Sequence, residues 1–176
     1  MKEIKIDVSK GDEKEISKIQ SWLDRVDEKW ISDLKSIHLL NDMTMTNVMK
    51  NLLPKHPRPY NINGYYLDGA IILRERKDDD RASVEGSFFH EIGHLIFEKK
   101  DWRERRKYVN ELFSIWDRYV GRFSYYEDSS YGDAECEIYA RVYSYWMLLK
   151  AGKADPIVDL PFIVDWAMDS MEKMFE

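Results

Sequence analysis

Hydrophobic and charged residues alternate over residues 3–8, EIKIDV, and this period of two predicts a half-buried β-strand. From residue 13 to about residue 34 the apolar positions recur every three or four residues, which predicts one long amphipathic helix. The residues that define this helix are Ile16, Ile19, Leu23, Val26, Trp30, Ile31 and Leu34. Short apolar runs at 36–40 and 69–75 predict two further strands.

The region between these two strands reads as connecting structure. Residues 41–53 predict a turn and a short helix, and residues 54–66 predict a loop, because their three prolines do not fit inside a helix or a central strand. The pair Asn63-Gly64 is a hairpin-turn signal.

The second half of the chain has the helical period. Helices are predicted at about 83–99, 101–120 and 133–150, with Gly152 closing the third and a last helix starting near Pro161. Strands early and helices late predict an α+β fold. We expect one domain over residues 1–176, with a strand-rich part at 1–82 and a mostly helical part at 83–176.

Composition excludes several classes of protein. A net charge of −6 and a pI near 5.3 argue against nucleic acid as a partner. The single cysteine, Cys136, excludes an intramolecular disulfide and a cysteine-based zinc cluster. No apolar run approaches the roughly 20 residues of a membrane span. The start is charged and has no signal-peptide core, so we expect a cytoplasmic protein, or a secreted one if the sequence is a trimmed mature form. We also expect a monomer.

The predicted helix at 83–99 contains the pattern H-E-x-x-H, with His90, Glu91 and His94. Residues four apart on a helix share a face, with Cβ atoms roughly 5–6 Å apart, so both imidazoles can bind one Zn²⁺. Glu91 is rotated by about 100° from His90, which lets it act as general base on a zinc-bound water. The alternative is a chance match on an amphipathic helix. The motif alone does not decide between them, because a zinc site also needs a third ligand.

The apolar helix at 133–150 offers two candidates for that ligand. A carboxylate inside a buried helix is costly unless it is paired or binds a metal. Glu135 lies in the first turn, where the helix dipole favours an acid and a capping role suffices. Glu137 lies further in and is the preferred ligand, with Glu135 as the alternative.

These motifs resemble a known family. A histidine-glutamate helix, a gap of about forty residues, then Tyr-Gly and a Glu-x-x-Ala helix look like the catalytic domain of anthrax lethal factor, and still more like the compact Pro-Pro endopeptidases, gluzincin-type zinc proteases. The resemblance follows the chain in order from the first strand to the last helix. It implies a zincin-like domain, one catalytic Zn²⁺ held by His90, His94 and Glu137, and Glu91 as general base. Tyr131 resembles the family's oxyanion-binding tyrosine.

The chain departs from the family pattern at two positions. The family's tyrosine precedes the ligand glutamate by seven residues, whereas Tyr131 precedes Glu137 by six and Ser130 takes the seventh place. Tyr125 and Tyr126 therefore compete for the oxyanion role. Family members often carry an acid after the alanine of Glu-x-x-Ala, where this chain has Arg141, so the hydrogen bond that orients a ligand must come from elsewhere.

The function implied is a zinc endopeptidase that cleaves peptides through a zinc-bound water. The substrate would lie extended along an edge strand at 69–75. Exposed tyrosines in the 54–66 loop, Tyr60, Tyr65 and Tyr66, are candidates for stacking on a proline-rich substrate, or are ordinary loop tyrosines. The alternatives are a regulatory protease and a non-catalytic zincin-fold module that keeps zinc as a structural element. Glu91 argues against the module, because a structural site has no use for a base.

Overall fold

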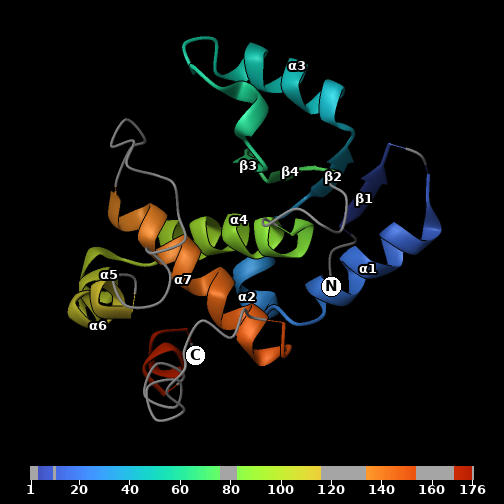
Figure 1. The fold of residues 1–176 in the computed structure, drawn as a ribbon. Helices are drawn as coiled ribbons and strands as arrows, with labels where there is room; N and C mark the ends of the chain where they lie inside the picture. The colour runs from blue at the N-terminus through green and yellow to red at the C-terminus, as the bar shows by residue number, and fades with distance from the viewer. Residues whose placement is uncertain (1–3, 10, 76–82, 116–133, 154–168, 176) are drawn as a thin grey trace. The chain divides into compact units, whose positions relative to one another are not determined.

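The computed structural model describes residues 4–9, 11–75, 83–115, 134–153 and 169–175 (Figure 1). The fold is α+β with a small mixed sheet of four strands, as the sequence predicts. The chain divides into two compact units, Met1–Leu95 and Ile96–Glu176, and the division falls within one helix. No helix in the described part of the chain is long and apolar enough to cross a membrane.

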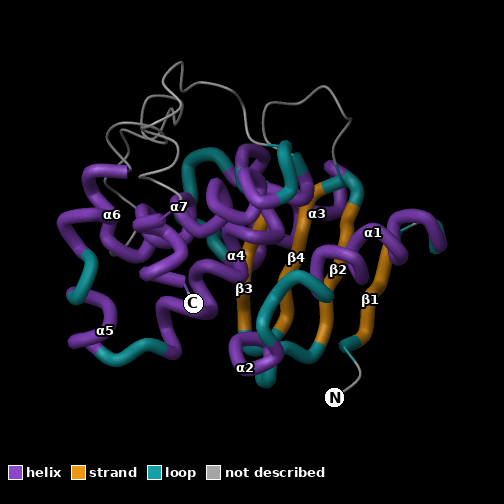
Figure 2. The backbone as a smooth tube through the Cα atoms, turned by 90° about the horizontal axis from the view of Figure 1, so that it is seen from below, coloured by secondary structure: helices purple, strands orange, loops and turns teal. Residues whose placement is uncertain are grey.

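The first unit is built on the sheet, whose strands lie side by side in Figure 2. They are β1 (Lys5–Val8), β2 (Ser36–Leu40), β3 (Gly64–Leu67) and β4 (Ala70–Arg74). The order is β1-β2-β4-β3; the first three run parallel and β3 is antiparallel to β4. The predicted strand at 36–40 is confirmed to the residue.

The strand at 69–75 is not at the edge of the sheet. β4 pairs with β2 on one side and with β3 on the other, so its backbone groups are used on both sides. The expectation that an extended peptide pairs with this strand is therefore wrong. In the described sheet, β3 takes the edge position next to β4.

The hairpin turn also differs from the prediction at Asn63-Gly64. The two residues that join β3 to β4 are Asp68 and Gly69, with φ angles of 50° and 85°. Positive φ at both positions is what a two-residue hairpin turn of type I′ requires. Asp-Gly supplies this turn, and Gly64 is instead the first residue of β3.

The predicted long helix at 13–34 is two helices. α1 (Glu13–Leu23) is capped by Asp12, and α2 (Glu28–Ile31) is capped by Asp27, whose side chain accepts a hydrogen bond from the Lys29 backbone N–H. This bond, together with one from the Lys29 side chain, lowers the pKa of the exposed Asp27 carboxyl. Val26 lies between α1 and α2 in the sequence and is buried, so the apolar period continues across the break.

Cross-strand pairing places apolar residues in rows on one face of the sheet. Val8, Leu39 and Leu73 form one such row, and the fourth place in it, on β3, is Gly64. All three side chains are buried.

Helix α4 (Val84–Lys99) starts where Ser83 accepts a hydrogen bond from the Gly86 N–H. The predicted helix at 83–99 is thus confirmed. Arg25, from the connection between α1 and α2, bonds Glu85 at 2.6 Å and lies over the Phe89 ring.

The other face of the sheet carries Arg74, which points opposite to Leu73 because side chains alternate along a strand. It contacts α3 (Asp42–Leu52) and the short 3-10 helix η1 (Pro59–Asn61). Figure 1 shows α3 and α4 on opposite sides of the sheet.

The second unit is helical. Its described helices are α5 (Trp102–Arg106), α6 (Val109–Ile115), α7 (Ala134–Lys150) and the helical residues 169–175. The predicted helix at 101–120 is therefore broken at Lys107 and Tyr108 and is described only as far as Ile115. Residues 116–133 and 154–168 lie outside the described part.

An aromatic cluster forms the core of this second unit. Its rings are Phe97, Tyr139, Tyr143, Trp146 and Phe175, packed with centroids 5.1–5.8 Å apart. Helix α7 ends as predicted at Gly152, whose φ of 67° allows its N–H and that of Lys153 to bond the last carbonyls of the helix.

Candidate metal centre

His90 and His94 lie one turn apart on α4, and both are half-buried. The opposite side of the helix is apolar and buried, which fixes its rotation; these residues are Phe88, Phe89, Ile92, Leu95 and Ile96. The two Nε2 atoms are 3.0 Å apart and the rings stand edge to face. Two nitrogens bound tetrahedrally to one zinc at about 2.0–2.1 Å would be about 3.3 Å apart. The pair therefore has the spacing that a shared ion requires.

Glu137 of α7 joins the histidines. One ligand atom from each of His90, His94 and Glu137 lies within 4.8 Å of the other two. These three residues are close enough to hold a metal ion, and Glu135 is not in the group.

Arg141 lies beside the third member of the cluster. Its Nε is 3.8 Å from the Glu137 Oε2, one helical turn away on α7. The chain thus puts a cation next to the carboxylate at the position where the resembled family often has an acid. A guanidinium at this distance attracts the carboxylate without a hydrogen bond of ordinary length.

Glu91 takes a different direction from the histidines. It is 5% exposed and is not a member of the three-residue cluster. Its carboxylate lies against β3, next to Gly64.

The tyrosines considered for the oxyanion role are not placed. Tyr131, Tyr125 and Tyr126 all fall at 116–133, outside the described residues. The part of the site that the structure describes is therefore the two histidines, Glu91, Glu137 and Arg141.

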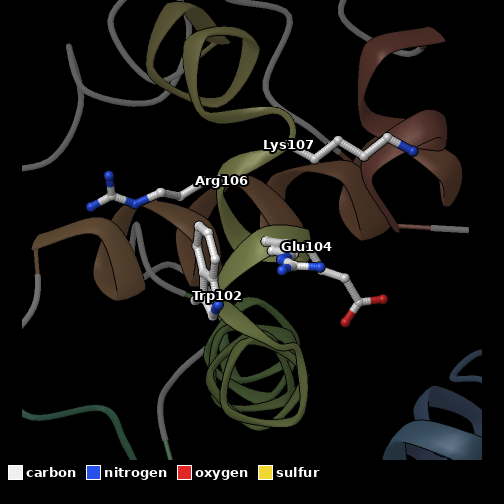
Figure 3. Close-up of a pocket in the computed structure, with 5 residues that line it drawn as sticks. Trp102, Glu104, Arg106 and Lys107 are labelled. Carbon is white, nitrogen blue, oxygen red and sulfur yellow. The ribbon is translucent and has the colours of Figure 1, made fainter.

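A shallow hollow of about 450 Å³ lies elsewhere, around the exposed Trp102 (Figure 3). Its lining comes from one short segment, Trp102, Arg103, Glu104, Arg106 and Lys107. None of the predicted site residues lines it. It has no acid–base pair or metal-ligand set among these lining residues, so we assign it no part in the chemistry considered for the site.

Sequence reasoning missed the contact between Gly64 and Glu91. The signal was present, because a glycine inside a strand often marks a close approach by another group. The same glycine also fits a hairpin turn with Asn63, and that competing signal hides the contact.

Comparisons with protein-family models, curated protein sequences and solved structures gave no match. The family resemblance therefore rests on the motifs of this chain, and what it implies about function is a proposal.

Proposed function

We propose that this chain is a zinc-dependent endopeptidase of the gluzincin type. The observation that carries the proposal is the cluster of His90, His94 and Glu137 within 4.8 Å, on an H-E-x-x-H helix and a downstream glutamate helix. Two imidazole nitrogens and one carboxylate oxygen are a donor set of catalytic zinc sites, which keep one position open.

Each residue then has a separate role. Zinc held by the three ligands would act as a Lewis acid and bring the pKa of a bound water toward about 7. Glu91 accepts a proton from the attacking water and passes it to the leaving amine. Its buried position excludes bulk water from the carboxylate, and the nearby Arg141 guanidinium favours the charged form of Glu137.

The proposed substrate is an extended peptide that pairs with β3, which has β4 on one side in the described sheet. Tyr60 is 55% exposed and precedes this strand, and Tyr65 lies within it. Flat aromatic side chains of this kind pack well on proline rings. They support, as part of the proposal, a preference for proline-rich peptides.

The first experiment measures metal in the purified protein. We expect about one zinc per chain. Glu137→Ala should weaken zinc binding by more than the roughly 10–100-fold typical for loss of an outer-shell partner. Glu135→Ala, two residues away on the same helix, is the matched control and should keep full affinity. The reverse result would assign the ligand role to Glu135.

The second experiment screens a peptide library that includes proline-rich sequences. Wild type should cleave some of these peptides, and a chelator should stop the cleavage. A protein that binds zinc but cleaves no peptide would be a non-catalytic module that retains a structural metal.

The role of Tyr131 is tested by Tyr131→Phe. Loss of one oxyanion donor costs about 10²–10³ in kcat, with a smaller effect on KM. Tyr125→Phe and Tyr126→Phe are the matched controls. If one of these variants is inactive and Tyr131→Phe is not, the role belongs to that residue.

A further inference from the structure

An apolar row on the sheet ends in an empty position. Val8, Leu39 and Leu73 are paired across β1, β2 and β4, and each is buried on the same face. The next residue in the row is Gly64, which pairs with Leu73. A fourth apolar side chain would complete the row, and the chain has none there.

The space is taken by Glu91. A Cβ added to Gly64 would lie 2.6 Å from Glu91 Oε1, 2.9 Å from its Cγ and 3.1 Å from its Cδ. Such distances are well inside van der Waals contact. The end of the Glu91 side chain therefore lies where the side chain of residue 64 would stand.

The backbone gives no other reason for a glycine. The described glycines with positive φ are Gly11, Gly69 and Gly152, and Gly64 is not among them. Gly64 has strand geometry that any residue adopts, and glycine is a poor residue for a strand. The glycine at position 64 leaves room for the Glu91 side chain.

We propose that Gly64 is a positioning residue for Glu91. By lacking a side chain, it lets the carboxylate rest against β3, and this contact fixes the direction in which Glu91 points from α4. Any side chain at residue 64 displaces the carboxylate, because its Cβ would lie 2.6 Å from Glu91 Oε1, the movable end of a flexible side chain. The catalytic consequence rests on the proposed function; the contact itself does not.

The contact is tested by a double-mutant cycle measured by melting temperature. The four proteins are wild type, Gly64→Ala, Glu91→Ala and the double variant. With Glu91 present, Gly64→Ala should lower the melting temperature or leave it unchanged. In the Glu91→Ala background, the new methyl group fills vacated space, so the same substitution should raise the melting temperature. The two effects should differ by at least about 2–4 °C. Equal effects in both backgrounds would overturn the proposal.

The positioning role is tested by kinetics on a cleaved peptide. Gly64→Ala should lower kcat by on the order of 10²-fold, the effect of moving a reacting group by about 1 Å. KM and zinc content should stay at wild-type values, and Gly64→Val should lose more than Gly64→Ala.

The control is Met43→Ala, whose side chain on α3 is 74% exposed and lies outside the proposed site. It should keep its kcat. Full kcat in Gly64→Ala would overturn the positioning role. A wild type that cleaves nothing would overturn the proposed function, and the double-mutant cycle would still decide whether Gly64 positions Glu91.

Discussion

Two buried charged side chains lie on opposite faces of the same sheet, and they are held in different ways. Arg74 is 2% exposed and donates to the carbonyls of Ile62, Pro59 and Asp42, and to the side chains of Asp42 and Thr46. Each nitrogen of its guanidinium has an acceptor. Glu91 is 5% exposed, and the end of its side chain lies beside Gly64, where an added Cβ would be 2.6 Å from its Oε1.

Under the proposed function, Arg74 is a structural charge and Glu91 a chemically used one. The bonds of Arg74 tie three separate segments together, so its value lies in the stability of the fold. Glu91 occupies a space kept clear for it, at a glycine that weakens the strand. A fold that keeps such a space accepts a cost in stability, which is common where a side chain must react.

The largest effect we expect is on the Glu91 side of this comparison. Glu91→Ala should lower peptide hydrolysis by about 10²–10⁴-fold, the usual contribution of a general base. Zinc content should not change, because Glu91 is not in the three-residue cluster, and the fold should be kept. Steady-state kinetics and thermal melting measure both quantities. A large fall in melting temperature with activity kept would show that Glu91 is structural.

Arg74 should behave in the opposite way. Arg74→Met removes the donors for several acceptors and should lower the free energy of unfolding by about 3–5 kcal/mol. Urea denaturation measures this change. Arg74→Lys is the matched control. It keeps the charge but not the planar set of donors, so its free energy of unfolding should lie between those of wild type and Arg74→Met. If Arg74→Met is as stable as wild type, the hydrogen bonds of Arg74 do not stabilise the fold, and a full set of partners does not identify a structural charge.

A third buried polar group, the Tyr139 hydroxyl, tests the effect of a missing hydrogen-bond partner on stability. The Tyr139 hydroxyl, in the aromatic core of the second unit, is buried and has no hydrogen-bond partner in the part of the chain described. Tyr139→Phe removes an unsatisfied group and keeps the ring, so it should raise the free energy of unfolding by about 1 kcal/mol. A loss of stability would mean that the hydroxyl has a partner in solution.

The same tyrosine predicts a dependence on pH. Burial, with smaller contributions from Tyr143 and Glu104, raises the pKa of Tyr139 far above its ordinary value of 10.0. The unfolded chain therefore loses this proton near pH 10 while the folded chain keeps it, so stability is complete below about pH 10 and falls as the pH rises above it. Denaturation curves from about pH 8 to 11 should show a fall that is smaller in Tyr139→Phe.

The sequence predicted the elements whose signals are local. The strand at 36–40, helix α4 and helix α7 with its Gly152 end all follow from periodicity and caps. Helical spacing paired His90 with His94, and the cost of a carboxylate inside a buried helix, together with the family resemblance, selected Glu137. The structure places them close in space.

Errors arose where two local signals competed or where pairing mattered. Periodicity runs unbroken through residues 13–34, but the Asp27 cap starts a new helix there. Asn63-Gly64 and Asp68-Gly69 are both hairpin signals, and only pairing with β4 decides between them. Strand order is likewise invisible in a single strand's pattern, which is why 69–75 was placed at the edge.

The two-residue turn at Asp68-Gly69 has a consequence for the order of folding. Leu67 and Ala70 meet across it, whereas β1 and β2, and β2 and β4, pair residues far apart in the chain. Closing a hairpin takes about 1–10 μs, and distant parallel pairs must first overcome a larger loop entropy. We expect the hairpin to form first, so that Gly64 already faces Leu73 when α4 arrives. A one-residue insertion in this turn that shifts the register by one would place Tyr65 opposite Leu73, and the early hairpin would then leave no room for the Glu91 carboxylate.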